Sequence, residues 1–183
     1  MYQKNILREK FINLRKKKYY EIDKEFFSPL LSFINTNFNK DDLKLALYYP
    51  TSFETNVLKL LENKYMINKN ILLPVIEKTN IMSFFPWKKN QVLLVNRFGI
   101  LEPIKTKFKI PNIILVPILA FDKNKYRLGY GKGFYDRYLN KYSKKFSNIL
   151  TVGVAFSFQK YHKLPIDNND VKLDFILTER GMY

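Results

Sequence analysis

The segments VPILAFD (residues 116–122) and RLGYGKGFYDR (residues 127–137) carry most of the information in this sequence. Glycines stand at every second position of the second segment, 129, 131 and 133, so its backbone can take positive φ and approach a ligand closely. The apolar residues 113–116 before it predict a strand, and residues 134–142 after it predict a helix. The N–H groups of the loop and the helix N-terminus therefore converge, an arrangement that binds phosphate.

The side chains of this glycine loop add charges that suit a phosphate ligand. Arg127 and Lys132 are cationic, and Asp136 in the first predicted helical turn is a hard carboxylate of the kind that binds Mg²⁺. The loop is not a Walker A motif, because no Gly-Lys-Ser/Thr follows four intervening residues. Alternating glycines also occur in tight turns that bind nothing, so the spacing alone does not decide between a turn and a site.

Outward from this loop, short apolar strands alternate with helices. We expect helices at 3–20, 23–36, 55–63 and 134–142, and strands at 43–49, 71–75, 81–85, 91–95, 112–116, 149–155 and 174–177, with 81–85 and 91–95 forming a hairpin. The alternation indicates one α/β domain over 1–183: a three-layer α/β/α, Rossmann-like fold with a mostly parallel sheet, the class shared with sugar-phosphate isomerases and CoA transferases. Ligands of such sheets bind beyond the carboxyl ends of the strands, where the glycine loop is expected.

The composition is that of a globular protein. Of 183 residues, 46% are hydrophobic and 16% aromatic, which argues against disorder. The absence of cysteine excludes disulfides, thiolate catalysis and zinc–thiolate sites, and fits a cytoplasmic protein. No apolar run approaches the roughly 20 residues of a membrane span, and the charged N-terminus does not resemble a secretory signal, so we expect no membrane association.

The net charge of +16 raises the possibility of nucleic-acid binding. Of the 32 basic residues 26 are lysine and 6 arginine, and asparagine occurs 18 times, a skew typical of AT-rich codon usage. Nucleic-acid surfaces more often use arginine for bidentate contacts, so we interpret clusters such as 15–18 (Arg-Lys-Lys-Lys) and Lys105, Lys107 and Lys109 as solvated faces. A basic surface would also attract anionic substrates such as ATP. A basic RNA-binding protein stays an alternative, which would show salt-sensitive, saturable RNA binding.

The glycine segment resembles the signature of the 5-formyltetrahydrofolate cyclo-ligase (5,10-methenyltetrahydrofolate synthetase) family. That signature is a strand ending in Pro, then Phe-Asp, then Arg-Leu-Gly-x-Gly-x-Gly-Tyr/Phe-Tyr-Asp, and each position is matched here. The resemblance covers nearly the whole chain, through Lys4 to Arg8, Phe53-Glu54-Thr55, Asn96-Arg97 to Glu102-Pro103, Lys163-Leu164-Pro165, and Asp174. By this resemblance the chain is identified as a member of that family.

The resemblance implies an ATP- and Mg²⁺-dependent ring-forming carbon–nitrogen ligase. It would convert 5-formyltetrahydrofolate to 5,10-methenyltetrahydrofolate and release ADP and phosphate, most simply as a monomer. Such chemistry needs alignment of two ligands and neutralisation of phosphate charge more than a covalent nucleophile. Another phosphate-ligand enzyme on a related scaffold, such as a sugar-phosphate isomerase, is the second alternative, but no base for a sugar carbon can be named.

The resemblance also implies the site residues. The phosphate-handling catalytic pair would be Lys132 and Arg127, and the magnesium ligands Asp136 and Asp174. ATP would contact Lys4, Asn5, Ile6, Leu7, Arg8, Arg127, Leu128, Gly129, Tyr130, Gly131, Lys132, Gly133, Phe134 and Tyr135. Folate would contact Leu47, Ser52, Glu54, Tyr130, Gly131, Lys132, Gly133 and Phe134.

Several of these positions admit a second interpretation. Ser52 stands where the family often has Glu, so Glu54 takes over its role or the pterin contact runs through water. Phe134 and Tyr135 offer aromatic surface to folate or anchor the helix, and residues 82–85 line the folate site or the core. We expect His162, the single histidine, at the surface and Trp87 in a turn or the core.

Overall fold

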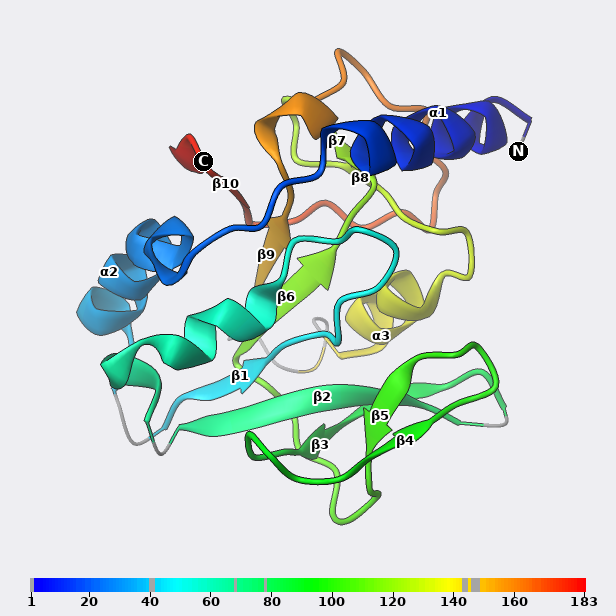
Figure 1. The fold of residues 1–183 in the computed structure, drawn as a ribbon. Helices are drawn as coiled ribbons and strands as arrows, with labels where there is room; N and C mark the ends of the chain where they lie inside the picture. The colour runs from blue at the N-terminus through cyan, green and yellow to red at the C-terminus, as the bar shows by residue number, and fades with distance from the viewer. Residues whose placement is uncertain (1, 40–41, 68, 78, 143–144, 146–148) are drawn as a thin grey trace.

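The computed structural model describes residues 2–39, 42–67, 69–77, 79–142, 145 and 149–183. Within these residues, seven strands form one central sheet (Figure 1), in the order β11 (Gly181–Met182), β10 (Phe175–Thr178), β9 (Leu150–Val154), β6 (Ile113–Pro117), β1 (Lys44–Ala46), β2 (Asn70–Ile76) and β3 (Met82–Pro86). The five strands β10, β9, β6, β1 and β2 are parallel to one another, while β3 and β11 pair antiparallel at the two edges. The predicted α/β fold with a mostly parallel sheet is confirmed.

The order of the parallel strands locates the expected ligand edge. In chain order β1, β2, β6, β9 and β10 are the first to fifth parallel strands, so the sheet runs 2-1-3-4-5, the flavodoxin-like variant of the doubly wound fold. The direction of winding reverses between β1 and β6. Ligands of doubly wound sheets bind in the crevice at this switch point, beyond the carboxyl ends of the two strands.

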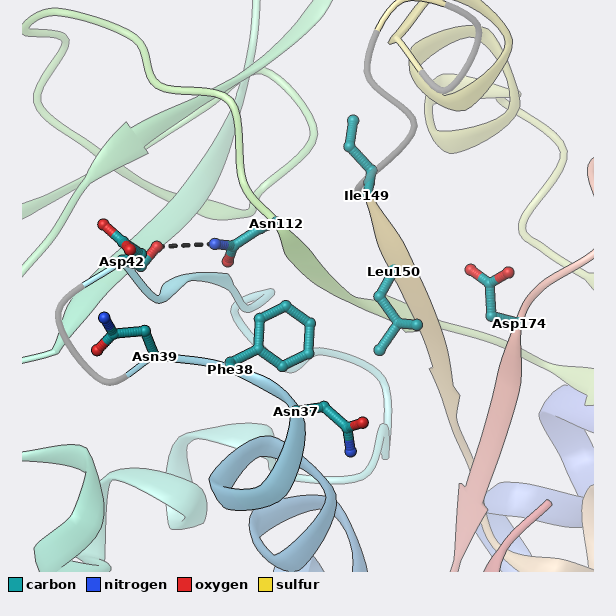
Figure 2. A pocket seen from close by; sticks show the side chains of 8 residues that line it. All are labelled: Asn37, Phe38, Asn39, Asp42, Asn112, Ile149, Leu150 and Asp174. Atoms are coloured by element: carbon teal, nitrogen blue, oxygen red, sulfur yellow. Dashed lines mark hydrogen bonds between the residues drawn. The ribbon is translucent and has the colours of Figure 1, made fainter.

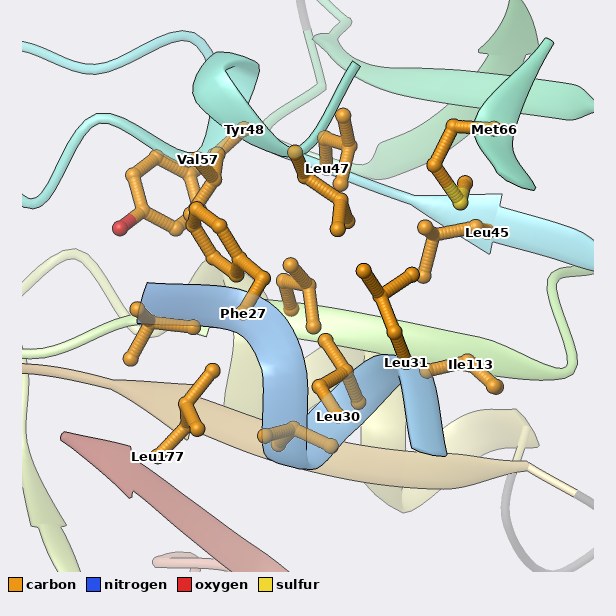
Figure 3. Packing of buried hydrophobic residues seen from close by; sticks show 14 of the residues in the cluster. Phe27, Leu30, Leu31, Leu45, Leu47, Tyr48, Val57, Met66, Ile113 and Leu177 are labelled. Atoms are coloured by element: carbon orange, nitrogen blue, oxygen red, sulfur yellow. The ribbon is translucent and has the colours of Figure 1, made fainter. Parts of the chain in front are cut away.

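Helices cover both faces of the sheet. The helices of the described residues are α1 (Tyr2–Lys18), η1 (Lys24–Phe27), α2 (Ser28–Asn37), η2 (Val57–Glu62), η3 (Lys64–Met66), α3 (Phe134–Tyr142) and η4 (Ser157–Gln159), where η denotes a 3-10 helix. Of these, α2 with η1, η2 and η3 packs on one face of the sheet and α3 on the other, whereas α1 lies elsewhere. Leu45 and Leu47 face α2 and the 3-10 helices in the larger apolar cluster (Figure 3), whereas Ala46 faces the cluster of α3. This alternation follows from the two-residue period of a strand, and it buries both faces.

Two predicted elements take a different form. The helix predicted at 55–63 is instead the shorter 3-10 helix η2 over Val57–Glu62, whose N-cap Asn56 accepts at Oδ1 a hydrogen bond from the backbone N–H of Leu58 at 3.2 Å. The first strand is ordered as β1 over Lys44–Ala46, shorter than the predicted 43–49, although the backbone N–H of Leu47 still bonds to Leu72 of β2 at 2.9 Å.

The predicted hairpin of 81–85 with 91–95 is wrong. β3 pairs instead with β2, through a turn in which the N–H of Glu77 bonds to the carbonyl of Ile81 at 2.8 Å and Asn80 has φ of 62°. A separate hairpin joins β4 (Leu93–Val95) to β5 (Leu101–Pro103), with Gly99 at φ of 74° in its turn. Each of the two hairpins, β2–β3 and β4–β5, has a turn with one residue in the left-handed region. The alternation of apolar residues carries no information about such turns, so it does not predict which strands pair.

The helix α1 lies on a small sheet formed by β7 (Ala120–Phe121) and β8 (Arg127–Leu128). Its residues Leu7 and Phe11 are buried with Leu119, Ala120 and Leu128 in a third apolar cluster. In Figure 1, α1 runs above β7 and β8, apart from the layers that flank the main sheet. This packing brings side chains from α1 to the segment that leads from β8 into the glycine loop.

Candidate active site at the glycine loop

The glycine loop connects β8 to α3 and has the backbone geometry that its sequence indicates. Gly131 and Gly133 have φ of +91° and +66°. A Cβ atom at Gly131 would lie 3.1 Å from Cζ of Arg8, and one at Gly133 would lie 2.9 Å from Nη1 of Arg137. The backbone angle therefore favours glycine at both positions, and a side chain there would also displace the guanidinium group of Arg8 or Arg137.

The loop after β1 meets the glycine loop at the switch point. Tyr130 donates its hydroxyl hydrogen bond to Oε1 of Glu54 at 2.6 Å. The other carboxylate oxygen accepts from the backbone N–H of Thr51 at 2.8 Å. Between them Ser52 and Phe53 take φ of 48° and 62°, two consecutive left-handed residues without glycine. Such backbone strain persists only where surrounding contacts hold it, and it concentrates at functional sites.

The ionisable groups at this junction are perturbed by burial. Glu54 is 6% exposed, and burial raises the pKa of its carboxyl group although the hydrogen bond from Tyr130 opposes the shift. Burial also raises the pKa of Tyr130 and of Tyr135, so both phenols stay protonated at neutral pH. The hydroxyl of Tyr135 is buried and lacks a hydrogen-bond partner within the described residues, which leaves a donor for a ligand or water.

A buried arginine from α1 completes the junction. Arg15 is 1% exposed, and its Nη2 donates to the carbonyl of Ser52 at 2.7 Å and to the hydroxyl of Tyr130. The sequence placed Arg15 among solvated lysines, and that interpretation is wrong for Arg15. The signal that could have identified it is its spacing, because it lies four residues after Phe11 and eight after Leu7 on the buried stripe of α1.

The two cations that were expected to handle phosphate, Arg127 and Lys132, differ in how they are held. The Arg127 side chain is 5% exposed, donating to Oδ1 of Asp136 at 2.5 Å and to the carbonyl of Val171 at 2.6 Å. Burial lowers the pKa of Arg127, although Asp136 opposes the shift. Lys132 is exposed, and its Nζ lies 5.9 Å from the centre of the Phe98 ring, close to the ring of Phe134. Lys132 is therefore the more accessible of the two cations.

The N-terminal part of α1 reaches the same region. Nε of Arg8 donates to the carbonyl of Gly129 at 2.9 Å, and its Nη1 donates to Oδ1 of Asn5 at 2.6 Å. Lys4 forms ion pairs with Asp167 at 2.6 Å and Asp170 at 2.5 Å. Burial lowers the pKa of Lys4, but the hydrogen bonds and charges of these two carboxylates outweigh it and raise the pKa above its ordinary value. The guanidinium group of Arg8 and the ammonium group of Lys4 thus bind different parts of the protein and do not converge on one ligand position.

The structure does not bring Asp136 and Asp174 into one magnesium site. Asp174 accepts hydrogen bonds from the backbone N–H and the hydroxyl of Thr151, at 2.8 and 2.6 Å. It lines a hollow of about 480 Å³ at the amino ends of β6, β9 and β10 (Figure 2), whereas the glycine loop lies beyond the carboxyl ends. Within the described residues no group of three acidic, histidine or cysteine side chains could hold a metal ion.

The family of the chain is decided by a match over nearly its whole length. The sequence model of the 5-formyltetrahydrofolate cyclo-ligase family matches residues 4–179. The chain belongs to this family. It is 34% identical over 141 residues to the 5-formyltetrahydrofolate cyclo-ligase of Haemophilus influenzae. This alignment covers 73% of this chain and 74% of that protein. Membership identifies the chain as a ligase and an enzyme of folate metabolism.

Two solved structures share the fold of this family. The 5,10-methenyltetrahydrofolate synthetase of Aquifex aeolicus superposes with a TM-score of 0.74 at 33% identity, covering 98% of this chain and 91% of that one. The 5,10-methenyltetrahydrofolate synthetase of Mycoplasma pneumoniae gives a TM-score of 0.69 at 26% identity, with 95% and 97% covered. Among the described residues, no helix is both long and apolar enough to span a membrane.

The residues that the family resemblance assigned to folate are only partly brought to the site. Ser52 and Glu54 lie at the junction with Tyr130, but Leu47 is fully buried in the larger apolar cluster, so its side chain cannot touch a ligand in this arrangement. Of the residues that the resemblance assigned to ATP, Leu7 and Leu128 have side chains buried between α1 and the small sheet, whereas Ile6 is exposed.

The remaining aromatic and histidine expectations are resolved by burial. Met82, Phe84 and Phe85 are core residues, as is Trp87 at 6% exposure. The ring of His162 lies beside that of Tyr161, with ring centres 4.4 Å apart and planes tilted by 48°, and lines a shallow surface hollow with Lys123 and Lys160. His162 therefore lies at the surface, as its sequence context indicated.

Proposed function

We propose that this chain catalyses the conversion of 5-formyltetrahydrofolate to 5,10-methenyltetrahydrofolate with hydrolysis of ATP to ADP and phosphate. Its family membership and the two similar methenyltetrahydrofolate synthetase structures support this proposal. The observation that carries it is the contact of Glu54 with Tyr130, which joins the loop after β1 to the glycine loop at the switch point of the sheet.

The reaction needs two bond-forming steps. The formyl oxygen attacks the γ-phosphorus of ATP, forming an O–P bond while the bond to the ADP oxygen breaks. The lone pair of N10 then attacks the activated formyl carbon, and the C–O bond breaks with its electron pair leaving on phosphate. The N10 proton ends on inorganic phosphate. The sum is one methenyl product, ADP and phosphate, with no oxidant and no covalent enzyme intermediate.

The glycine loop would serve the phosphate half of this chemistry. Its N–H groups and the N-terminus of α3 would hold the terminal phosphates. Lys132, exposed beside them, would neutralise charge on the transferring phosphoryl group. Arg127, held by Asp136 and the carbonyl of Val171, would supply a fixed positive charge behind the loop. Arg8 would keep the loop in place through the carbonyl of Gly129.

Magnesium enters this proposal with ATP as the substrate complex. The described residues do not offer a preformed site for the ion, because Asp136 is paired with Arg127 and Asp174 with Thr151. No step of the reaction is therefore assigned to a protein-bound metal.

The junction would serve the folate half. The pterin ring presents N–H donors, which a carboxylate accepts, and Glu54 is the acid buried at the junction. Ser52 and Tyr130 stand beside it and would complete the polar contacts. All of these residues come from one chain, so we propose a monomeric enzyme, acting in the cytoplasm where ATP and reduced folates are available.

An isotope-transfer experiment with ¹⁸O in the formyl group of the substrate tests this mechanism. 5-Formyltetrahydrofolate carrying ¹⁸O in the formyl group is incubated with the enzyme and Mg-ATP, and the phosphate released is examined by mass spectrometry. One ¹⁸O atom per phosphate is expected, since the formyl oxygen becomes a phosphate oxygen. Phosphate that takes its oxygen from water instead would show that the chain is a simple ATPase.

A further inference from the structure

Arg15 is a fully buried cation that the proposed chemistry does not use. It is 1% exposed, although arginine is almost never fully buried without a partner. Leu7, Phe11 and Arg15 form one stripe on α1, so an apolar face ends in a guanidinium group. Taking this charge out of water is unfavourable unless hydrogen bonds and an opposite charge compensate it.

The contacts of Arg15 all lie at the switch point of the sheet. Its Nη2 donates to the carbonyl of Ser52, after β1, and to the hydroxyl of Tyr130 in the glycine loop. Its Nη1 lies 3.5 Å from the carbonyl of Ile118, just after β6. One side chain thus contacts the loop after β1, the glycine loop and the residue that follows β6.

The direction of the hydrogen bonds that connect Arg15, Tyr130 and Glu54 follows from which of these groups can donate. A guanidinium group only donates and an ionised carboxylate only accepts. Since Arg15 donates to the oxygen of Tyr130, the hydroxyl hydrogen of Tyr130 is directed to Oε1 of Glu54. The positive charge of Arg15 is in this way connected to the negative charge of Glu54 through one phenol, and the rotation of that hydroxyl is no longer free.

Arg15 also holds the strained turn at residues 52–53. Ser52 and Phe53 both have positive φ, and Arg15 binds the carbonyl of Ser52 directly. The turn positions Glu54, whose second oxygen is held by the N–H of Thr51. Without Arg15, both the turn and the orientation of Tyr130 would lose their common support.

We propose that Arg15 is a positioning residue of the folate subsite, which holds Ser52, Glu54 and Tyr130 in the arrangement that receives the substrate. The role rests on the proposed function, because it assigns the substrate contact to Glu54 and Tyr130. Arg15 itself acts through these residues and does not touch the reacting atoms.

The electrostatics of the junction agree with this role. The ionisable or charged groups that face Glu54 are Arg15 from α1, Tyr48 after β1, Tyr130 from the glycine loop and Tyr135 from α3. Burial raises the pKa of Glu54, and Arg15 is the positive charge that opposes this shift. The three phenols have raised pKa values and stay neutral, so Arg15 supports the ionised form of Glu54 together with the hydrogen bonds from Tyr130 and Thr51.

The experiment compares Arg15→Gln with Lys16→Gln. Lys16 is the next residue on α1 and is exposed, so its variant removes one positive charge without touching the junction. Two quantities are measured: the KM values for folate and for ATP, and the titration midpoint of the Glu54 carboxyl by NMR of protein carrying ¹³C-labelled glutamate. The Glu54 signal is assigned by its loss in Glu54→Gln.

We expect Arg15→Gln to raise the KM for folate about tenfold or more while the KM for ATP changes less than about twofold, since a charge-assisted contact at the folate side is lost. We expect the Glu54 midpoint to rise by about one pH unit or more, because the opposite charge that favours its ionised form is removed. Lys16→Gln should change neither quantity. A folded Arg15→Gln protein with an unaltered Glu54 midpoint or an unaltered KM for folate would overturn the proposal.

Tyr130→Phe keeps the test decisive if Arg15→Gln does not fold. If Arg15 acts through Tyr130, Tyr130→Phe should reproduce the higher KM for folate and the higher Glu54 midpoint. Where both single variants fold, the double variant should add little to either, and fully additive effects would contradict the proposed link. The titration of Glu54 needs no substrate. An inactive wild-type enzyme would therefore contradict the proposed function, while the titration would still test whether Arg15 positions Glu54.

Discussion

Replacing Gly131 by alanine is the most direct test of the glycine loop as described. At φ of +91° an L-residue is strained, at roughly 1–2 kcal/mol. The new Cβ would lie 3.1 Å from Cζ of Arg8, so the guanidinium group must move and its 2.9 Å hydrogen bond to the carbonyl of Gly129 weakens, at roughly 1 kcal/mol. We therefore expect the free energy of unfolding to fall by about 2–3 kcal/mol, and the KM for ATP to rise, since Arg8 is displaced.

Gly129→Ala is the matched control in the same loop. A Cβ at Gly129 would have no atom within 4 Å, and its backbone is not left-handed, so the free energy of unfolding should change by less than about 0.5 kcal/mol. Urea unfolding followed by the fluorescence of Trp87, the single tryptophan and buried in the core, measures both variants. In thermal unfolding the difference corresponds to roughly 4–12 °C for a chain of this length. Equal stability of the two variants would refute the loop geometry.

Three further predictions concern individual side chains. Lys132→Ala should lower kcat by an order of magnitude or more and leave the melting temperature nearly unchanged, because Lys132 is exposed and is proposed to neutralise the transferring phosphate; an unaltered kcat removes it from the site. Asp174→Asn should lower the free energy of unfolding by about 1–2 kcal/mol through weaker hydrogen bonds to Thr151, while the Mg²⁺ concentration for half-maximal rate stays as in the wild type; a shifted Mg²⁺ titration would return Asp174 to the metal site. Burial raises the pKa of Glu54 above its ordinary 4.5, so the stability contributed by the protonated carboxyl is present at low pH and lost as pH rises through the raised pKa. Urea unfolding of Glu54→Gln and of the wild type should therefore show the variant gaining stability relative to the wild type between about pH 4 and pH 7. A difference in stability that stays constant with pH would contradict the raised pKa.

The sequence predicts the elements that depend on local periodicity. The helix at 134–142 is found as α3 over Phe134–Tyr142, and the strand at 112–116 as β6 over Ile113–Pro117. The positive φ of Gly131 and Gly133 was likewise indicated by the residue type. In each case the decisive interaction lies within a few residues of the chain.

Features that depend on distant partners were not predictable in the same way. The pairing of β3 with β2 depends on a turn at Asn80, and the alternation of 81–85 is compatible with either partner. Arg15 and Lys16 are adjacent basic residues in the sequence, yet only Arg15 points to the junction, because α1 docks on β7 and β8 through that face. Asp174 matched a family carboxylate, but its hydrogen bonds to Thr151 arise from the pairing of β9 with β10.

The growth of methenyltetrahydrofolate absorbance on addition of the enzyme to 5-formyltetrahydrofolate tests the central claim most directly. With Mg-ATP present the absorbance should rise at a rate proportional to the enzyme concentration, with one ADP released per product formed. Without ATP, or with an ATP analogue that cannot transfer its γ-phosphate, it should stay flat. A folded enzyme that produces no methenyltetrahydrofolate with Mg-ATP, or that produces it equally well without ATP, would contradict the proposed reaction.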